Sequence, residues 1–475
     1  MLYAITGIAT KMIGALLLPV LTRLLSVREY GVIDLIALGS LIGLELIVIG
    51  TDFVAALYYN EPTVARGRVA GTLVLMRLIA GGGLAGAVIV AAPALSRWGF
   101  GTVQPDLVRA IRVAAVSLPL SAMLSFWIIW LRQAGRAGVV LGVTLLRVAA
   151  TALVTIALVR ATPDRLAAYF WAAFYVDCGL ALALGALFRA EIGRPSLALG
   201  RLLLGKGVAF LPRSIYFVAM TLITRQLLLH YGSLELVGQY AAAVKVSFIV
   251  WIAINATNYA WLSYSLSIVD NPAAPTIYRN YLSDYVMFLG LCVVGVAVFA
   301  SDILRLLTTP EYLSAAPAVG WLALSLMAVG SLVIVTTGLN IIKDTGVIGR
   351  TTIITALLNI GLALALIPRT GLLGAAVAAA LDQGIAAVLL YRLSQQRYPI
   401  PFDARRVAVW LALIICIVSI ASYLPLDRSL PLLLLKLGIV AGYMLLMVRL
   451  GNLSRLRTMY SVPGAKAIQS RSSTE

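Results

Sequence analysis

Long apolar stretches separated by short polar gaps run along the whole chain of 475 residues. Each stretch has about 18 residues or more, which is enough to cross a bilayer as a helix. The strict alternation of apolar and polar positions that marks a membrane-spanning strand is absent. The pattern therefore predicts an all-α polytopic membrane protein of about fourteen transmembrane helices. The expected spans are 3–25, 32–59, 70–95, 107–131, 138–160, 166–188, 207–231, 236–266, 282–307, 314–342, 347–368, 371–394, 404–424 and 430–450.

The composition supports a membrane protein, because 61% of the residues are hydrophobic and only 12% are charged. The net charge of +18 does not indicate a nucleic-acid partner, since Lys and Arg gather in the gaps between apolar stretches. Cys178, Cys292 and Cys416 all lie inside apolar stretches, so no disulfide framework is expected. The first stretch can span by itself, so we expect no cleavable signal sequence. Its bare amino end suggests that a short polar leader is missing.

The distribution of cations predicts the orientation of the chain. Twenty Lys and Arg residues follow even-numbered spans or lie in the tail, against eight after odd-numbered spans, or eleven if Arg109, Arg112 and Lys436 are included. Cytoplasmic loops carry this kind of excess, so both termini are expected in the cytoplasm. The charged stretch RLLSVREYGVIDL, residues 23–35, is then expected to be a tight turn on the outer face.

Two weak internal matches indicate a duplicated unit. SVREYGVIDLIALGS from Ser26 matches SLELVGQYAAAVKVS from Ser233 at an offset of 207, and Asp177-x-Gly matches Asp382-x-Gly at an offset of 205. Near-equal offsets that pair each span with the one six further on predict a parallel repeat of six helices. The expected organisation is an N-lobe at 1–188, a basic cytoplasmic linker at 189–206, a C-lobe at 207–395, two further spans within 396–450, and a cytoplasmic tail at 451–475.

Several loose motifs occur together in one order: RLLSVREYG, LPRS at the seventh span, VGQYAAAVK at the eighth, DILRLLTTPEYLSAAP, and LLNIGLALALIPRTGLLGAAVAAA. In these motifs, over about residues 1–395, the chain resembles the polysaccharide transporters of the multidrug/oligosaccharidyl-lipid/polysaccharide (MOP) exporter superfamily. These are the flippases of O-antigen and exopolysaccharide synthesis. The last two spans match only in hydropathy.

The resemblance implies two six-helix lobes in a V around a central cavity, two additional C-terminal helices, and alternating access to the two membrane faces. The implied substrate is an undecaprenyl-diphosphate-linked oligosaccharide, moved from the inner to the outer leaflet of a bacterial inner membrane. The implied partners are membrane lipid and a polysaccharide polymerase or glycosyltransferases, and we expect a monomer. The family has no invariant catalytic motif, so it assigns no site residue. A multidrug exporter of the same superfamily stays open as an alternative.

Ionisable residues deep in the predicted spans are the candidate binding groups, because such residues are costly in a bilayer and usually face a cavity or a partner. Cations outnumber anions, and this surplus suits a diphosphate headgroup. The alternative for each cation is an ion pair between helices or a side chain that reaches back to the interface. The cations are Lys11, Arg77, Arg147, Arg213, Arg225 and Lys245; the anions, all candidates for ion coupling, are Glu45, Asp52, Asp177 and Asp382.

Glu45 and Asp52 are seven residues apart, which predicts that they lie on one face of the second helix. Two neighbouring carboxylates in a medium of low dielectric suit proton coupling, because both cannot easily be ionised. The alternative is that Lys11 and Arg77 neutralise them. In the eighth span, a polar and aromatic face carries Tyr240, Ser247, Trp251, Asn255 and Asn258. We expect Trp251, Asn255 and Asn258 to face sugar, and hydrogen bonding between helices is the alternative.

Signatures of an enzyme are missing. The single histidine, His230, lies near an outer interface beside Tyr231, where anchoring is expected. No nucleotide-binding loop is present, and we expect no catalytic residue, metal or cofactor. The rival from another class is a membrane-embedded glycan polymerase or ligase, which needs a large polar outer loop. The longest gap here is the linker, so the sequence favours a transporter.

Overall fold

The computed structural model describes residues 17–59, 61, 64–342, 344, 346–426 and 429–451. The side chains at positions 53, 209, 211–217, 259, 260, 262, 263 and 451 lie outside this description. The described residues form helices and connecting turns, with no strand among them. Eleven of these helices are long and apolar enough to cross a membrane. The prediction of an all-α polytopic membrane protein is therefore confirmed.

The predicted spans can be traced onto the helices. The helix α15 (Gly346–Arg397) contains two predicted spans, which meet at Gly371 with φ 56°. The helix α9 (Leu211–Tyr231) occupies the seventh predicted span. Most of the first predicted span lies outside the described residues, of which 17–24 are helical.

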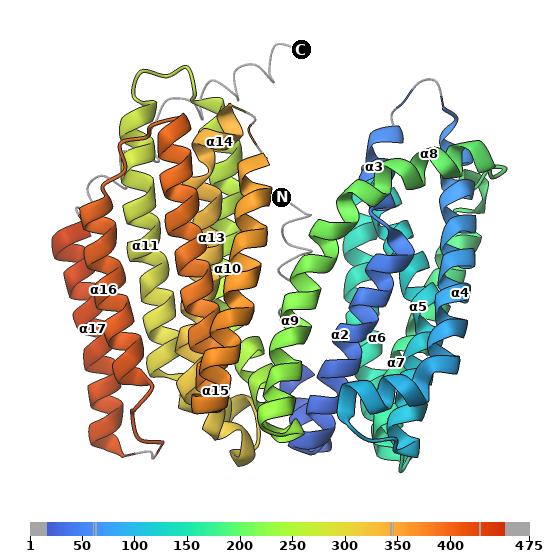
Figure 1. Ribbon diagram of the computed structural model, residues 1–475, viewed down its shortest axis with the longest axis horizontal. Helices are drawn as coiled ribbons and strands as arrows, with labels where there is room; N and C mark the ends of the chain where they lie inside the picture. The colour runs from blue at the N-terminus through green and yellow to red at the C-terminus, as the bar shows by residue number, and fades with distance from the viewer. Residues whose placement is uncertain are drawn as a thin grey trace.

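The helices form two groups that stand side by side (Figure 1). The groups meet at the end of the molecule where α2 begins and α9 ends, and they diverge toward the end that carries α3 and α8. We call these the junction end and the linker end. The first lobe contains α2 (Val27–Val48), α3 (Thr51–Tyr58), α4 (Arg66–Phe100), α5 (Pro105–Gln133), α6 (Ala137–Ala161) and α7 (Arg165–Leu187).

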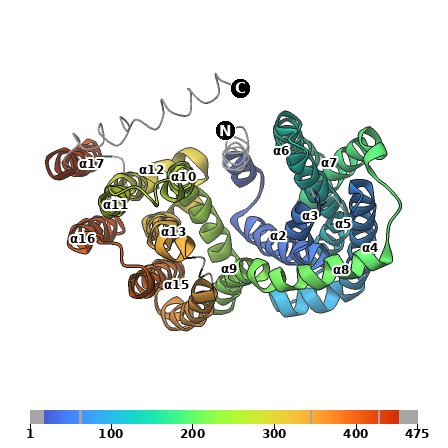
Figure 2. The ribbon, with the colours of Figure 1, turned by 90° about the horizontal axis from the view of Figure 1, so that it is seen from above.

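The second lobe contains the remaining long helices. Its members are α9, α10 (Leu234–Ser267), α11 (Ala274–Val298), α12 (Ala300–Leu307), η3 (Pro310–Ala315), α13 (Ala316–Val335), α14 (Thr337–Ile341) and α15. The last two helices, α16 (Ala404–Ala421) and α17 (Leu430–Gly451), lie on the outer flank of this lobe beside α11 (Figure 2). Tyr443 fixes α17 there, because its hydroxyl donates to the carbonyl oxygen of Met287 at 3.0 Å.

The charged stretch near the start of the chain is mostly helix, which corrects the predicted outer turn at 23–35. The helix α2 begins at Val27, and a capping box stabilises its first turn. The Ser26 hydroxyl accepts the Glu29 N–H at 3.2 Å, and the Glu29 carboxylate accepts the Ser26 N–H at 2.7 Å. The turn itself is therefore confined to the residues just before Val27.

The predicted second span, 32–59, is broken in the middle. Ile49 and Gly50 take left-handed conformations, with φ 49° and 65°, and separate α2 from α3. The linker packs against this break: a Cβ atom on Gly50 would lie 2.4 Å from the carbonyl oxygen of Gly207. Apolar periodicity predicts one helix here, but this close backbone approach requires a turn.

The linker between the lobes consists of η1 (Arg189–Glu191), α8 (Leu197–Gly207) and η2 (Val208–Phe210). Figure 2 shows α8 running along the edge of the first lobe. The N–H of Gly193 donates to the carbonyl oxygen of Gly67 at 2.7 Å, and the Trp130 indole N–H donates to the Glu191 carboxylate at 2.7 Å. The linker is therefore fixed to the first lobe along its length.

Candidate functional site

The two lobes touch backbone to backbone at the junction end. A Cβ atom on Gly31 of α2 would lie 2.2 Å from the carbonyl oxygen of Leu234, and one on Gly238 of α10 would lie 2.2 Å from that of Val27. No side chain fits at either glycine. Both glycines belong to the two matching stretches at the 207-residue offset. The stretches that resemble each other in sequence thus pack against each other.

A buried ion pair crosses the same junction. The Arg225 Nε of α9 donates to Asp34 Oδ2 of α2 at 2.6 Å, and the side chains are 5% and 17% exposed. Arg225 Nη1 also donates to the carbonyl oxygen of Thr221 at 3.2 Å, and the guanidinium lies 5.1 Å from the ring centre of Tyr240. The charge of Arg225 is compensated only while α2 stays against α9.

Lys245 of α10 also reaches toward the first lobe. Its ammonium lies 5.4 Å from the ring centre of Tyr30, and Tyr30 meets the ring of Tyr312 edge to face at 6.0 Å. No carboxylate among the described residues lies within ion-pair distance of Lys245. Lys245 is thus a half-buried cation whose charge is balanced by an aromatic face rather than by an anion.

Arg77 and Asp52 form an ion pair inside the first lobe. Arg77 is 1% exposed and also donates to the carbonyl oxygen of Ala122 at 2.5 Å, while its guanidinium lies 5.4 Å from the ring centre of Phe126. Ser125 completes the group by donating to Asp52 at 3.3 Å. This is the arrangement expected if Arg77 neutralises Asp52, the alternative to a coupling role for that carboxylate.

Arg147 of α6 and Asp177 of α7 form a two-pronged ion pair. The Nε and Nη2 atoms of Arg147 donate to the two Asp177 oxygens at 2.7 and 2.6 Å, and the Ser121 hydroxyl donates to Asp177 at 2.6 Å. Asp177 is 1% exposed, whereas Arg147 is 36% exposed. Asp177 therefore holds Arg147 in a fixed orientation while part of the guanidinium stays accessible.

Asp382 of α15 is the other fully buried carboxylate among the described residues. The amides of Gln383 and Asn359 are beside it, with Gln383 Nε2 at 2.7 Å from Oδ2. Its Oδ1 accepts no hydrogen bond, and no described cation lies within ion-pair distance. The residue that corresponds to Arg147 at the 205-residue offset is Thr352. The two lobes thus differ in charge at positions that match in sequence.

The polar face of α10 makes contacts with neighbouring backbone. Ser247 donates to the carbonyl oxygen of Val319 at 3.0 Å, and Asn258 donates to that of Gly330 at 3.1 Å. Asn255 donates to the carbonyl oxygen of Trp251 at 3.0 Å. The Ser247 and Asn258 bonds are the ones expected if the face joins helices, whereas the Asn255 bond stays within α10, and the sugar-facing role of Trp251, Asn255 and Asn258 stays a prediction.

The remaining predicted site residues are Lys11, Arg213 and Glu45. Lys11 lies outside the described residues, and so does the side chain of Arg213. Glu45 is half-buried on α2 and does not share a helical face with Asp52, because the break at residues 49–50 puts Asp52 on α3. The prediction of a stacked Glu45–Asp52 pair on one continuous helix is therefore wrong.

The sequence prediction missed Asp34, because that residue lies where the expected outer turn at 23–35 overlaps the start of the predicted span 32–59. The unexplained cation Arg225 within the seventh span was the available signal that an anion had to lie nearby. His230 lies exposed at the end of α9, with its ring 4.8 Å from that of Tyr231. Within the part of the chain that the structure describes, no three His, Cys, Asp or Glu residues come together in a way that could hold a metal ion.

Comparison with known proteins identifies the fold. No family model matches the sequence, and no curated protein matches it. The lipid II flippase MurJ, solved in an inward closed conformation, matches with a TM-score of 0.69 and 10% identity, over 94% of this chain and 99% of MurJ. A multidrug resistance MATE family transporter of the MOP superfamily, solved in an inward-facing conformation, gives a TM-score of 0.67 and 13% identity, over 85% of this chain and 95% of its own. A MOP superfamily transporter from Pyrococcus furiosus matches with a TM-score of 0.55 and 14% identity, over 86% of this chain and 94% of its own. The chain therefore has the fold of MOP superfamily transporters.

Proposed function

We propose that this protein is a flippase that moves an undecaprenyl-diphosphate-linked oligosaccharide from the inner to the outer leaflet of a bacterial inner membrane. The observation that carries the proposal is the lobe junction, where Gly31, Gly238 and the Asp34–Arg225 pair hold two otherwise diverging lobes together at one end. Such a junction allows two arrangements of the lobes. The similarity of fold to a lipid II flippase over 94% of the chain supports this choice of substrate class.

In the proposed orientation, the linker end faces the cytoplasm together with both termini, and the junction end faces outward. The lobes then stand apart toward the inner leaflet, where the lipid-linked substrate is made. Outward opening separates α2 from α9 and α10, which breaks the Asp34–Arg225 pair. The transport cycle therefore exchanges one set of contacts between the lobes for another.

The diphosphate binds the cations that keep an accessible edge or have no carboxylate partner among the described residues. Arg77 and Arg225 are 1% and 5% exposed and pair with carboxylates, so they hold helices together. Arg147 keeps an accessible edge, and Lys245 has no carboxylate partner among the described residues. Lys245 and Arg147 are therefore the primary phosphate contacts, with Arg213 and Lys11 as further candidates on sequence grounds.

Coupling to an ion gradient falls to Asp382. Asp52 and Asp177 are held in ion pairs with Arg77 and Arg147, so binding a proton there would break a buried pair. Among the described residues, Asp382 has neutral amides beside it, no cation within ion-pair distance and one oxygen without a hydrogen bond, so a proton or a small cation at that oxygen removes an uncompensated charge. Glu45 is the remaining candidate.

Deletion of the gene in its native host tests the proposal. Undecaprenyl-linked repeat units accumulate on the inner leaflet if the protein is their flippase. Complementation by Lys245→Ala or Arg147→Ala fails to restore export at unchanged protein abundance, whereas Arg455→Ala and Arg457→Ala in the tail restore it. A deletion strain with normal lipid-linked intermediates refutes the proposal.

A second candidate is an exporter of amphipathic drugs, which the similarity of fold to a MATE family transporter favours. The same deletion strain separates the two functions. Increased sensitivity to cationic drugs without accumulation of lipid-linked repeat units supports the drug exporter. Accumulation without a change in drug sensitivity supports the flippase.

A further inference from the structure

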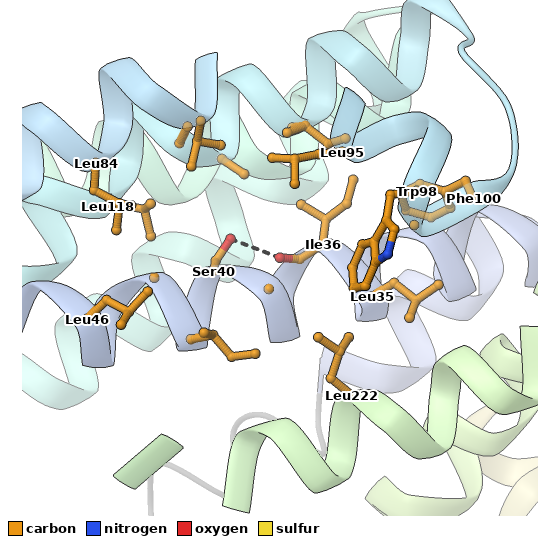
Figure 3. Close-up of a pocket in the computed structure, with 18 of the residues that line it drawn as sticks. Leu35, Ile36, Ser40, Leu46, Leu84, Leu95, Trp98, Phe100, Leu118 and Leu222 are labelled. Atoms are coloured by element: carbon orange, nitrogen blue, oxygen red, sulfur yellow. Dashed lines mark hydrogen bonds between the residues drawn. The ribbon is translucent and has the colours of Figure 1, made fainter. Parts of the chain in front are cut away.

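An apolar groove lies beside the lobe junction, between α2, α4 and α5 of the first lobe and α9 of the second (Figure 3). Its volume is about 310 Å³, at the lower end of the range of ligand pockets in proteins. The walls include Leu35 and Ile36 of α2, Leu84 and Leu95 of α4, and Leu222 of α9. The groove therefore needs both lobes to exist in this form.

The lining offers few groups to a polar ligand. Among the described residues that line the groove none is charged, and the polar groups are the Ser40 hydroxyl, the Gln226 amide and the Trp98 indole N–H. The Ser40 hydroxyl donates to the carbonyl oxygen of Ile36 at 2.9 Å, as the dashed line in Figure 3 shows. Hydrocarbon is thus the chemistry that fits, because an empty space of this size leaves its lining without van der Waals partners.

The groove opens to the surroundings of the protein. Leu46, Leu95 and Trp98 line it and are 40%, 37% and 74% exposed. Trp98 lies near the end of α4, and tryptophan is enriched where membrane proteins meet the interface. A chain can therefore enter from the hydrocarbon layer of the bilayer.

Gly39 on α2 leaves open space along the floor of the groove. A Cβ atom on Gly39 would have no atom within 4 Å, whereas one on Gly43 would lie 3.1 Å from Leu118 Cδ1. The open space at Gly39 accommodates a branched hydrocarbon chain as well as a straight one. A larger side chain at Gly39 fits the helix without a backbone clash and fills the groove.

We propose that this groove seats a segment of the polyprenyl chain of the transported lipid while its headgroup lies between the lobes. The inference rests on the proposed function and adds a binding site for the tail. One wall, formed by Leu222 and Gln226, neighbours Arg225 on α9. Opening the junction moves this wall away from α2, so the groove exists in one half of the cycle. An occupant that must enter and leave in each cycle is the tail of the substrate, not a permanently bound bilayer lipid.

The test is photochemical crosslinking with a polyprenyl phosphate that carries a diazirine on its chain and has no sugar. The protein is purified full length in nanodiscs of phosphatidylethanolamine and phosphatidylglycerol. The expected adducts lie on peptides that contain Leu35 and Leu222. Gly39→Leu lowers their yield by about ten-fold, because a filled site excludes the chain. Gly86→Leu is the matched control, since Gly86 lies on the same stretch of α4, is exposed, and has no atom within 4 Å of its Cβ position.

Adducts confined to other surfaces overturn the inference, and so does an equal yield from phosphatidylglycerol with a diazirine on its acyl chain. The positions of the adducts in the wild-type protein test the site without any variant. Leu222→Trp is a second blocking variant, which fills the groove from the other lobe. The assay uses neither transport nor sugar. If the deletion strain confirms the flippase but no adducts form in the groove, the proposed binding site in the groove alone is refuted. If adducts form in the groove of the purified protein but the deletion strain accumulates no lipid-linked intermediates, the proposed function alone is refuted.

Discussion

Replacing Asp34 by Asn removes the charge that compensates Arg225 across the lobe junction. Arg225 is 5% exposed in this arrangement, so its charge stays buried without a counter-charge. Removal of one partner from a buried ion pair costs about 3–5 kcal/mol, and the 17% exposure of Asp34 favours the lower end. The cost falls on the junction-closed state, because an open junction admits water to Arg225.

A cost of about 3 kcal/mol corresponds to a shift of about a hundred-fold toward the junction-open state, since each 1.4 kcal/mol is a factor of ten. A state populated at about 1% then rises to about one half. Pulsed electron paramagnetic resonance measures this shift as a second, longer distance between spin labels across the junction. Arg28 and Tyr231 are exposed positions for the labels, after replacement of the three native cysteines.

Two variants control for effects of charge in general. Asp106→Asn removes a carboxylate that pairs with Arg109 on the surface of the first lobe, where both side chains are more than half exposed, and it leaves the distances unchanged. The charge-swapped variant Asp34→Arg/Arg225→Asp restores the short distance. A single short distance in Asp34→Asn, identical to that of the parent, refutes the assignment of the pair as a junction contact that favours closure.

Four further outcomes are expected. Gly238→Ala places a methyl group against a backbone carbonyl and forces the lobes apart at a cost of about 1–3 kcal/mol, so export falls, whereas Gly86→Ala exports normally. Asp382→Asn abolishes export at unchanged abundance, because an amide cannot exchange a proton; normal export in this variant removes Asp382 from coupling. Lys245→Arg retains part of the export that Lys245→Ala loses, measured as surface glycan, since a cation remains for phosphate. A reporter that works only in the cytoplasm is active when fused after Glu475, and activity of a periplasm-only reporter there contradicts the proposed orientation.

Hydropathy was sufficient to predict the class of the fold and most of the spans. It failed at residues 49–50, where the predicted span continues across Gly50, Thr51 and Asp52 but the chain turns. At this turn the backbone of Gly207, more than 150 residues later in the sequence, packs closely against Gly50. Local apolar pattern carries no information about such a contact. The break at Gly371 was easier to predict, because one predicted span already ended at 368 and the next began at 371.

The candidate site was predicted only in part, for a similar reason. Because charged residues are rare inside spans, Arg225 and Arg77 were marked as important. Their partners Asp34 and Asp52 are set by the packing of helices, and Asp34 and Arg225 are 191 positions apart in the sequence. Asp34 also sat in a charged stretch that was assigned to a loop. The groove gave no signal at all, because apolar residues that line a space have the same sequence pattern as those that fill a core.

The paired glycines at the junction have the geometry of a two-fold symmetric interface. Gly31 approaches Leu234, and Gly238 approaches Val27. At the offset of 207 residues, Gly31 corresponds to Gly238 and Val27 corresponds to Leu234. Exchanging the two halves therefore turns each contact into the other. This is how identical subunits meet in a homodimer, where one surface serves both partners. If the two halves arose by duplication of a six-helix ancestor, a single glycine in that ancestor created both contacts at once.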